Sequence, residues 1–205
     1  FLDRAYEIGR NPFHAVQALH ALQAAGEEEE LMRRAHAAEV KGPAVLQLQV
    51  SPLLYQNAVK LAGDDAKRAL ERLVHMVEVA AQDPAVLPTL VSLGFVNAGR
   101  ALARLGRAED ALRAMDRAVA ASTVDAALVS RGLLKAELGM RDEALRDFEE
   151  AVRAGTVLIW PFLYLAYEAA SHGRWNELAT YAHGGLRHAR SGPFRARLLE
   201  WSAIA

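Results

Sequence analysis

Apolar side chains recur every three or four positions through most of the chain, and short breaks at proline or glycine separate these periodic stretches. The spacing places the apolar residues of each stretch on one face of an α-helix, whereas a strand would alternate at every second position. Asp83-Pro84 is typical of a helix start, and Gly106 and Gly139 are typical of helix ends. The pattern predicts helices over residues 12–25, 27–41, 43–62, 65–82, 88–105, 107–121, 125–138, 141–154, 158–172, 174–190 and 193–205, with residues 1–9 as the end of an earlier helix.

The connections between these predicted helices are short. Loops of roughly two to five residues force consecutive helices to run antiparallel. Alanine and leucine dominate the composition, while β-branched and aromatic residues are sparse, and this balance favours helices over strands. Because no linker is long enough to separate two domains, we predict one all-α domain over residues 1–205, built from antiparallel helix hairpins.

Small residues recur at a fixed distance in the second half of the chain. At an offset of 33 residues the matched positions are Gly99 and Gly132, Gly106 and Gly139, Ala111 and Ala144, Met115 and Phe148, and Ala118 and Ala151. A further offset of 34 extends the match more weakly, with Gly173 at the turn and Ala166 in place of Gly132. Small side chains allow two helix backbones to approach closely, and a helix–turn–helix unit repeated at this period indicates a stacked solenoid.

This pattern resembles the tetratricopeptide repeat over residues 92–187. The resemblance rests on a small residue seven positions before the turn glycine, a small residue five positions after it, and a large apolar residue followed by a second alanine. It implies a right-handed α–α superhelix, or solenoid, in which residues 91–190 form three repeats, residues 1–90 form divergent helix pairs, and residues 191–205 form a capping or continuing helix. The third repeat exchanges large and small residues, with Leu178 in place of the first alanine, so we expect its hairpin to pack at a shifted angle. A HEAT-like array, with longer units, is the alternative.

In the tetratricopeptide family, the first helix of each repeat lines the concave surface of the superhelix, and the resemblance implies that a partner binds there. The residues expected on this surface are Val96, Arg100, Arg104, Leu133, Glu137, Trp160, Leu163 and Tyr167. Arginines beside apolar and aromatic side chains would suit a peptide that carries both acidic and apolar residues.

A structural interpretation of the same arginines stays open. Arg100 and Arg104 can instead pair with Glu137 on the neighbouring predicted helix, and both interpretations can hold at once. The lysine–asparagine clamp of chaperone-binding family members is not reproduced, because Val96 and Arg100 stand in its place. We therefore do not expect recognition of a chaperone tail.

Charged residues at two other places also allow a structural and a functional interpretation. Arg131 and Lys135 fall where the family packs apolar residues, so they need partners, of which Asp147 and Glu168 are candidates, or else they mark a second contact site. The acidic run Glu27–Glu30 fits the start of a helix, where the helix dipole favours negative charge, or else a patch that binds calcium or a basic partner.

The composition argues against several function classes. The formal net charge is −1, so no broad basic field is present to hold nucleic acid or an anionic membrane. The chain has no cysteine and no apolar run of about 18 residues that would insert into a membrane. The histidine spacings do not place two rings on one helix face, and no catalytic or phosphate-binding motif is present. We predict no catalytic residue, metal or cofactor; an enzyme would need a deep pocket with several titratable residues.

We therefore expect a non-catalytic scaffold that binds a partner peptide, helix or protein. The alternative is a ligand- or peptide-sensing regulatory domain of a larger signalling or transcription-regulating protein. The start at Phe1 without a methionine and the end at Ala205 inside a predicted helix suggest an excised piece of a longer protein, and the excess of arginine over lysine suggests a bacterial source. A cytoplasmic location is expected, with the periplasm left open. An apolar face on residues 193–205 predicts further repeats or self-association.

Overall fold

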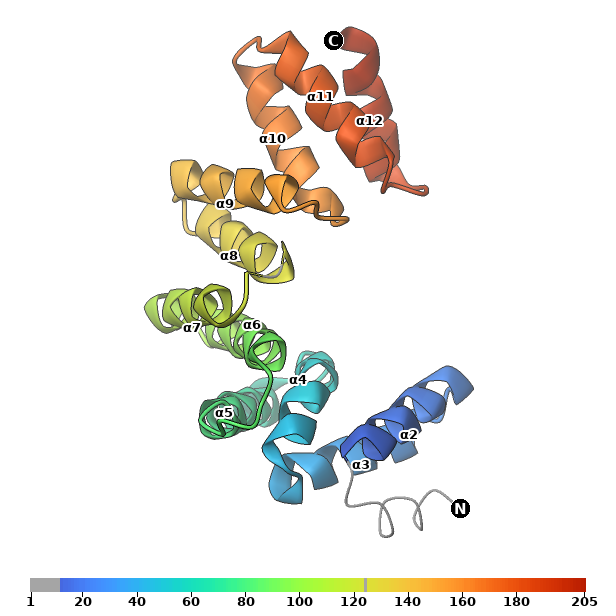
Figure 1. The fold of residues 1–205 in the computed structure, drawn as a ribbon, viewed down its shortest axis with the longest axis vertical. Coiled ribbons are helices and arrows are strands. Elements are labelled where there is room, and N and C mark those ends of the chain that lie inside the picture. The colour runs from blue at the N-terminus through green and yellow to red at the C-terminus, as the bar shows by residue number, and fades with distance from the viewer. Residues whose placement is uncertain (1–11, 124) are drawn as a thin grey trace. The chain divides into compact units, whose positions relative to one another are not determined.

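Residues 12–123 and 125–205, which the computed structural model describes, form eleven α-helices and no strand (Figure 1). The helices are α2 (Pro12–Ala25), α3 (Glu28–Lys41), α4 (Ala44–Ala58), α5 (Gly63–Ala80), α6 (Pro88–Arg104), α7 (Ala108–Ala121), α8 (Asp125–Glu137), α9 (Arg141–Arg153), α10 (Ile159–Ser171), α11 (Trp175–Leu186) and α12 (Pro193–Ile204). The predicted helices are present with ends shifted by a few residues, so the all-α fold class is confirmed. Asp83-Pro84 is not a helix start: it lies in the turn before α6, where the Asp83 carboxylate accepts a hydrogen bond from the N–H of Ala85. The helix end predicted for residues 1–9 lies outside the described residues.

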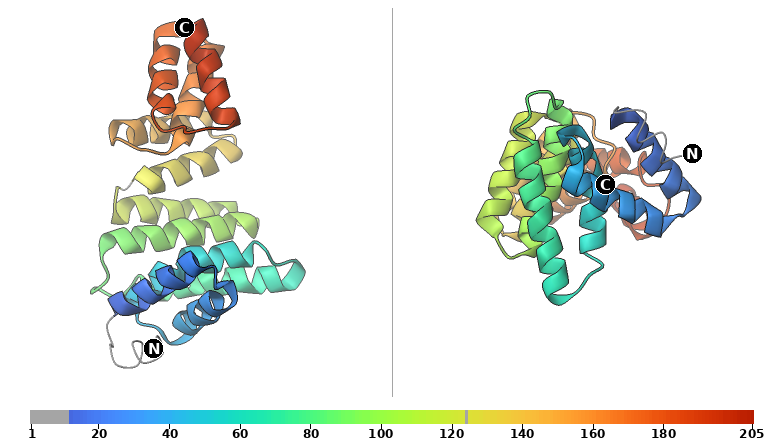
Figure 2. Two further views of the ribbon diagram at one scale, coloured as in Figure 1. Left: turned by 90° about the vertical axis from the view of Figure 1, so that its right-hand side faces the viewer. Right: turned by 90° about the horizontal axis from the view of Figure 1, so that it is seen from below.

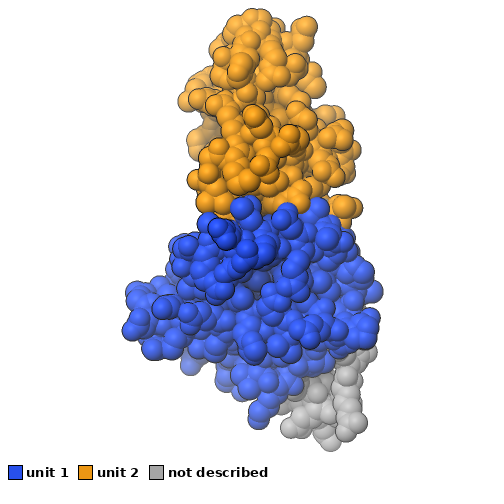
Figure 3. Space-filling model, turned by 90° about the vertical axis from the view of Figure 1, so that its left-hand side faces the viewer, with its two compact units in different colours: residues 1–122 blue, residues 123–205 orange. Residues whose placement is uncertain are grey.

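The chain divides into two compact units, Phe1–Ser122 and Thr123–Ala205 (Figure 3). Unit 1 contains α2 to α7, and unit 2 contains α8 to α12. Within each unit a helix packs chiefly on its neighbours in sequence, as expected for helices joined by short loops. The prediction of a single repeat domain over residues 1–205 stays a prediction.

Helix α4 lies in the middle of unit 1, where it contacts α2, α3, α5 and α6. Its buried side chains do not form one stripe, since Leu46, Leu48 and Val50 are all buried, which is expected of a helix covered on several sides. Two polar side chains in this core are bonded to each other: Asn97 of α6 donates a hydrogen bond to the hydroxyl of Ser51, 3.2 Å away.

The two well-matched repeats use glycine in the first helix to admit a large side chain of the second. A Cβ on Gly99 would lie 2.9 Å from Met115 Cε, and a Cβ on Gly132 would lie 2.7 Å from Phe148 Cε1. The turn glycines Gly106 and Gly139 have φ values of 75° and 77°, which side-chain-bearing residues rarely adopt. The small–large pairs deduced from the sequence are therefore direct packing contacts.

The third hairpin, α10 and α11, keeps the same rule with the sizes exchanged. Leu178 of α11 packs against the small Ala166 and Ala169 of α10. Ala182 instead lies beside Leu198 of α12, whose side chain is fully buried. Helices α10, α11 and α12 lie side by side in both Figures 1 and 2, so α12 covers one side of this hairpin.

Candidate functional site

Four side chains of α10 follow one another along a single side of that helix. Trp160, Leu163, Tyr164 and Tyr167 are spaced at three, four and seven positions from the first, which aligns them on one helix face. We call these four residues the α10 face. Tyr167 is 59% exposed and Trp160 is 39% exposed, although aromatic side chains are usually covered in a helical core. The α10 face therefore presents apolar area that the described residues leave uncovered.

An open hollow of about 460 Å³ lies between the α10 face and the start of α12. Pro193, Phe194 and Arg197 of α12 form its other wall. The ring of Phe194 meets the ring of Trp160 edge to face, with centroids 4.9 Å apart. Since Gly192-Pro193 begins α12 with proline in the first turn, this local start sets the position of Phe194 in the wall.

A second hollow, of about 340 Å³, lies on the other side of Tyr167, against α8 and α9. It shares Tyr164 and Tyr167 with the first hollow. The ring of Tyr164 packs on Phe148 of α9 with centroids 4.8 Å apart. At the rim, Arg141 Nε donates to Glu168 Oε2 at 2.8 Å. Tyr167 thus stands between two apolar hollows and contributes to both.

Three predicted site residues are brought together in unit 2, and two are placed elsewhere. Trp160, Leu163 and Tyr167 line the first hollow. Leu133 is half-buried and packs on the core cluster around Phe148, while Glu137 is exposed at the end of α8. Sequence reasoning missed four residues that line this hollow, Tyr164, Pro193, Phe194 and Arg197. Helical spacing from Trp160 would have identified Tyr164, but the wall from α12 lies outside the matched repeats.

In unit 1 the structure corrects one predicted site residue. Val96 is only 4% exposed and belongs to the core, because α6 packs against α4, α5 and α7 and is buried at every position from Gly94 to Gly99. Arg100 and Arg104 are exposed. Arg104 lines a third hollow, of about 400 Å³, together with Lys67 of α5 and Leu61. No acidic residue of the described segments lines this hollow, so its charge is positive.

The cations predicted to need partners have them. Arg131 donates two hydrogen bonds to the carboxylate of Asp147, from Nε at 2.9 Å and from Nη2 at 2.7 Å. Lys135 Nζ lies 3.0 Å from Asp147 Oδ2. Asp147 is 3% exposed, so both cations neutralise a buried charge between α8 and α9. This pairing supports the structural interpretation of Arg131 and Lys135.

The other features of the described segments that bear on function are possible metal ligands, possible membrane-spanning helices and side chains with a shifted pKa. Among these residues no group of three histidine, aspartate or glutamate side chains could hold a metal ion. No described helix is long and apolar enough to cross a membrane. Hydrogen bonds from Arg33 and Arg34 lower the pKa of Glu30 to about 2, and burial raises the pKa of Tyr181 above its ordinary value.

No protein-family model matches the sequence, and no curated protein matches it significantly. Solved structures are similar in fold. PilW, described as a widely conserved type IV pilus biogenesis factor, has a TM-score of 0.63 and 14% identity, and the match covers 95% of this chain and 87% of that chain. YrrB, described as a TPR protein with an unusual peptide-binding site, has a TM-score of 0.55 and 17% identity over 97% of both chains.

A third solved structure is TTC0263, a thermophilic TPR protein of Thermus thermophilus. It has a TM-score of 0.54 and 20% identity, and the match covers 93% of this chain and 98% of that chain. At these identities the likeness concerns the fold alone. Together with the repeated small–large contacts of the helix hairpins, these likenesses show that the chain has the tetratricopeptide-repeat fold.

Proposed function

We propose that the chain is a non-catalytic scaffold that binds a peptide or helix of a partner protein, with the α10 face as its principal contact. The observation that carries this proposal is the exposure of Tyr167 and Trp160, 59% and 39%, beside two apolar hollows. Large aromatic side chains at the centre of an apolar depression are the residues that dominate binding energies at protein interfaces. A fold of stacked hairpins supplies such surfaces without a deep catalytic cleft.

The charges near these surfaces favour a partner segment with carboxylates next to apolar residues. Arg197 lines the first hollow, its side chain is 61% exposed, and it donates a hydrogen bond to Glu200 at 3.1 Å. In unit 1, Arg104 and Lys67 place two positive charges at the third hollow. Arginine can bind a carboxylate through two parallel hydrogen bonds, so an acidic residue flanking an apolar anchor would add affinity and orientation.

A random-peptide display library, panned on the purified chain, tests the proposal. Enriched peptides should carry an aromatic or large aliphatic residue near an acidic one, and synthetic copies should bind with a measurable dissociation constant by fluorescence polarisation. Trp160→Ala combined with Tyr167→Ala should weaken that binding at least about tenfold, about 1.4 kcal/mol.

Trp175→Ala is the matched control for this experiment. Trp175 is 50% exposed in the same unit but lines neither hollow, so its substitution should leave peptide affinity unchanged. Equal binding by the double variant and the wild type, or no peptide enriched over a scrambled set, would show that the α10 face is not the contact. Self-association through the terminal helices and a cytoplasmic location stay predictions.

A further inference from the structure

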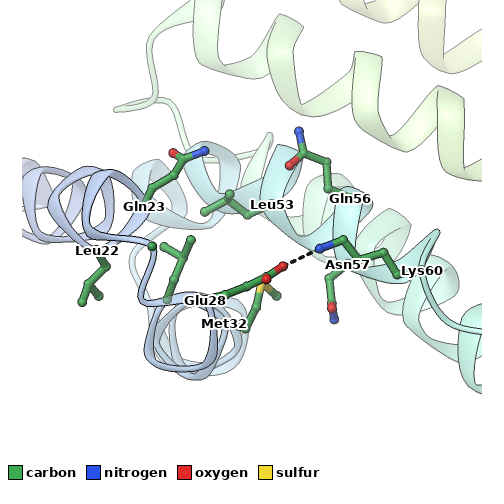
Figure 4. A pocket seen from close by; sticks show the side chains of 10 residues that line it. Leu22, Gln23, Glu28, Met32, Leu53, Gln56, Asn57 and Lys60 are labelled. Atoms are coloured by element: carbon green, nitrogen blue, oxygen red, sulfur yellow. Dashed lines mark hydrogen bonds and ion pairs between the residues drawn. The ribbon is translucent and has the colours of Figure 1, made fainter.

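A small hollow in unit 1 differs from the three described above in the chemistry of its lining. It lies where the end of α2, the start of α3 and the last turns of α4 meet, and its volume is about 230 Å³ (Figure 4). Its apolar part consists of Leu22, Leu31, Met32 and Leu53. Leu22 and Leu31 are each only 6% exposed and form the floor, whereas Met32 and Leu53 are half-buried and offer the apolar surface that a ligand can contact.

One positive and one negative side chain lie together at this hollow. The ammonium group of Lys60 donates a hydrogen bond to the carboxylate of Glu28 (Figure 4). The two side chains are 64% and 71% exposed. An exposed ion pair of this kind contributes about 0–1 kcal/mol, so a ligand can open it at small cost. The hydrogen bond from Lys60 also lowers the pKa of Glu28 below its ordinary value.

Three amide side chains complete the lining: Gln23 from α2, and Gln56 and Asn57 from α4. Within the described part of the chain these three side-chain amides make no hydrogen bond, while their neighbours Glu28 and Lys60 are paired. Each amide offers two donor hydrogens and an acceptor oxygen. They can therefore bond to either charged end of a small polar molecule.

We propose that this hollow binds a free α-amino acid with an apolar side chain, whose ammonium group contacts Glu28, whose carboxylate contacts Lys60, and whose side chain packs on the leucines and methionine. Charge selects this class, because a singly charged ligand would meet one attractive and one repulsive group, whereas a zwitterion satisfies both. Size agrees, since a hollow of about 230 Å³ is larger than the space that one or two waters need and can admit a small organic molecule. Binding here would give the chain a ligand-sensing role.

Calorimetric titration of the purified chain with leucine, methionine and valine tests this assignment. At least one should bind with a dissociation constant on the order of 1 mM or tighter. Leucine amide lacks the free carboxylate and N-acetylleucine lacks the ammonium group, so each should bind at least about tenfold more weakly than leucine. Equal affinity for these blocked forms, or no heat with any amino acid, would overturn the proposal.

Substitutions of the ion pair between Glu28 and Lys60 provide a second test of the proposal. Glu28→Gln and Lys60→Met should each weaken leucine binding at least about tenfold, and circular dichroism verifies that each variant is folded before titration. The matched control is Asp65→Asn, which removes another exposed ion pair of unit 1, with Arg68, that does not line the hollow. Unchanged affinity in both ion-pair variants would also overturn the proposal.

This inference does not rest on peptide binding by the α10 face, and the two can fail separately. Trp160→Ala with Tyr167→Ala should leave the leucine titration unchanged, because those residues belong to unit 2. Glu28→Gln should leave peptide affinity unchanged for the same reason. A loss of leucine binding in the unit 2 variant would contradict the placement of the ligand at Glu28 and Lys60.

Discussion

The hydroxyl of Ser51 donates a hydrogen bond to the carbonyl oxygen of Leu48, 2.7 Å away, inside the core of unit 1. In an uninterrupted helix that carbonyl would accept from the N–H of residue 52, but residue 52 is proline and has no N–H. Ser51 therefore satisfies the acceptor that Pro52 leaves without a partner. The same hydroxyl accepts a hydrogen bond from the side chain of Asn97 of α6. One side chain therefore both satisfies the open backbone carbonyl of α4 and links α4 to α6.

Ser51→Ala should lower the free energy of unfolding by about 1–3 kcal/mol, because it leaves a buried carbonyl and a buried amide hydrogen without a partner. Urea denaturation followed by circular dichroism measures this. Ser202→Ala is the matched control, since Ser202 makes the same kind of bond to Leu199 at an exposed site, and it should change stability by less than about 0.5 kcal/mol. Equal stability of the two variants would contradict the role given to Ser51.

Gly132→Ala should destabilise unit 2 although alanine is the better helix former. The gain in helix propensity is about 1 kcal/mol, but the new Cβ would lie 2.7 Å from a ring atom of the fully buried Phe148, and overpacking costs about 1–3 kcal/mol. Gly99→Ala should cost less, because its nearest contact is the flexible end of Met115. Thermal unfolding measures how much stability each variant loses, and a larger loss for Gly99→Ala than for Gly132→Ala would refute the packing argument.

Asp147→Asn should be among the most destabilising polar substitutions in unit 2. It removes the anion between Arg131 and Lys135, whose side chains are 17% and 13% exposed, and breaking a buried ion pair costs about 3–5 kcal/mol. Glu177→Gln, which breaks an exposed pair with Arg174, should cost less than about 1 kcal/mol. Similar denaturation midpoints for both variants would show that the Asp147 cluster contributes little.

The carboxyl group of Glu30 should titrate near pH 2 rather than at its ordinary pKa of 4.5, chiefly because of hydrogen bonds from Arg33 and then Arg34. Since the pKa is lower in the folded state, this group stabilises the fold above about pH 4.5 and that stabilisation is lost as the pH falls towards 2. Carbon-13 NMR of the side chain follows the titration. Arg33→Ala should raise the midpoint towards 4.5, and an unshifted midpoint in the wild type would contradict the assigned pairing.

The helices and their hairpin packing could be predicted from the apolar periodicity and from the recurring small residues. Each helix packs on its neighbour in sequence, and in the second half of the chain the pairing of a small with a large residue, such as Gly132 with Phe148, recurs at a fixed spacing. Site residues were harder to predict. Val96 occupies a position that the family exposes, yet α6 is covered on more sides than a repeat helix because α4 also packs on it. Phe194 depends on how α12 packs on α10, and no repeat relates that helix to the others. The Ser51–Asn97 bond joins residues 46 positions apart, which no local pattern encodes.

The packing of helices on their immediate successors bears on how the chain reaches its native state. In unit 2, α8 contacts α9, α9 contacts α10, α10 contacts α11 and α11 contacts α12, so most of the loops that must close are short. Proteins with such local contacts fold fast, on microsecond to millisecond timescales. Unit 2 should therefore assemble one hairpin at a time, starting from whichever neighbouring pair is most stable, and its refolding rate should respond little to substitutions far from that first pair.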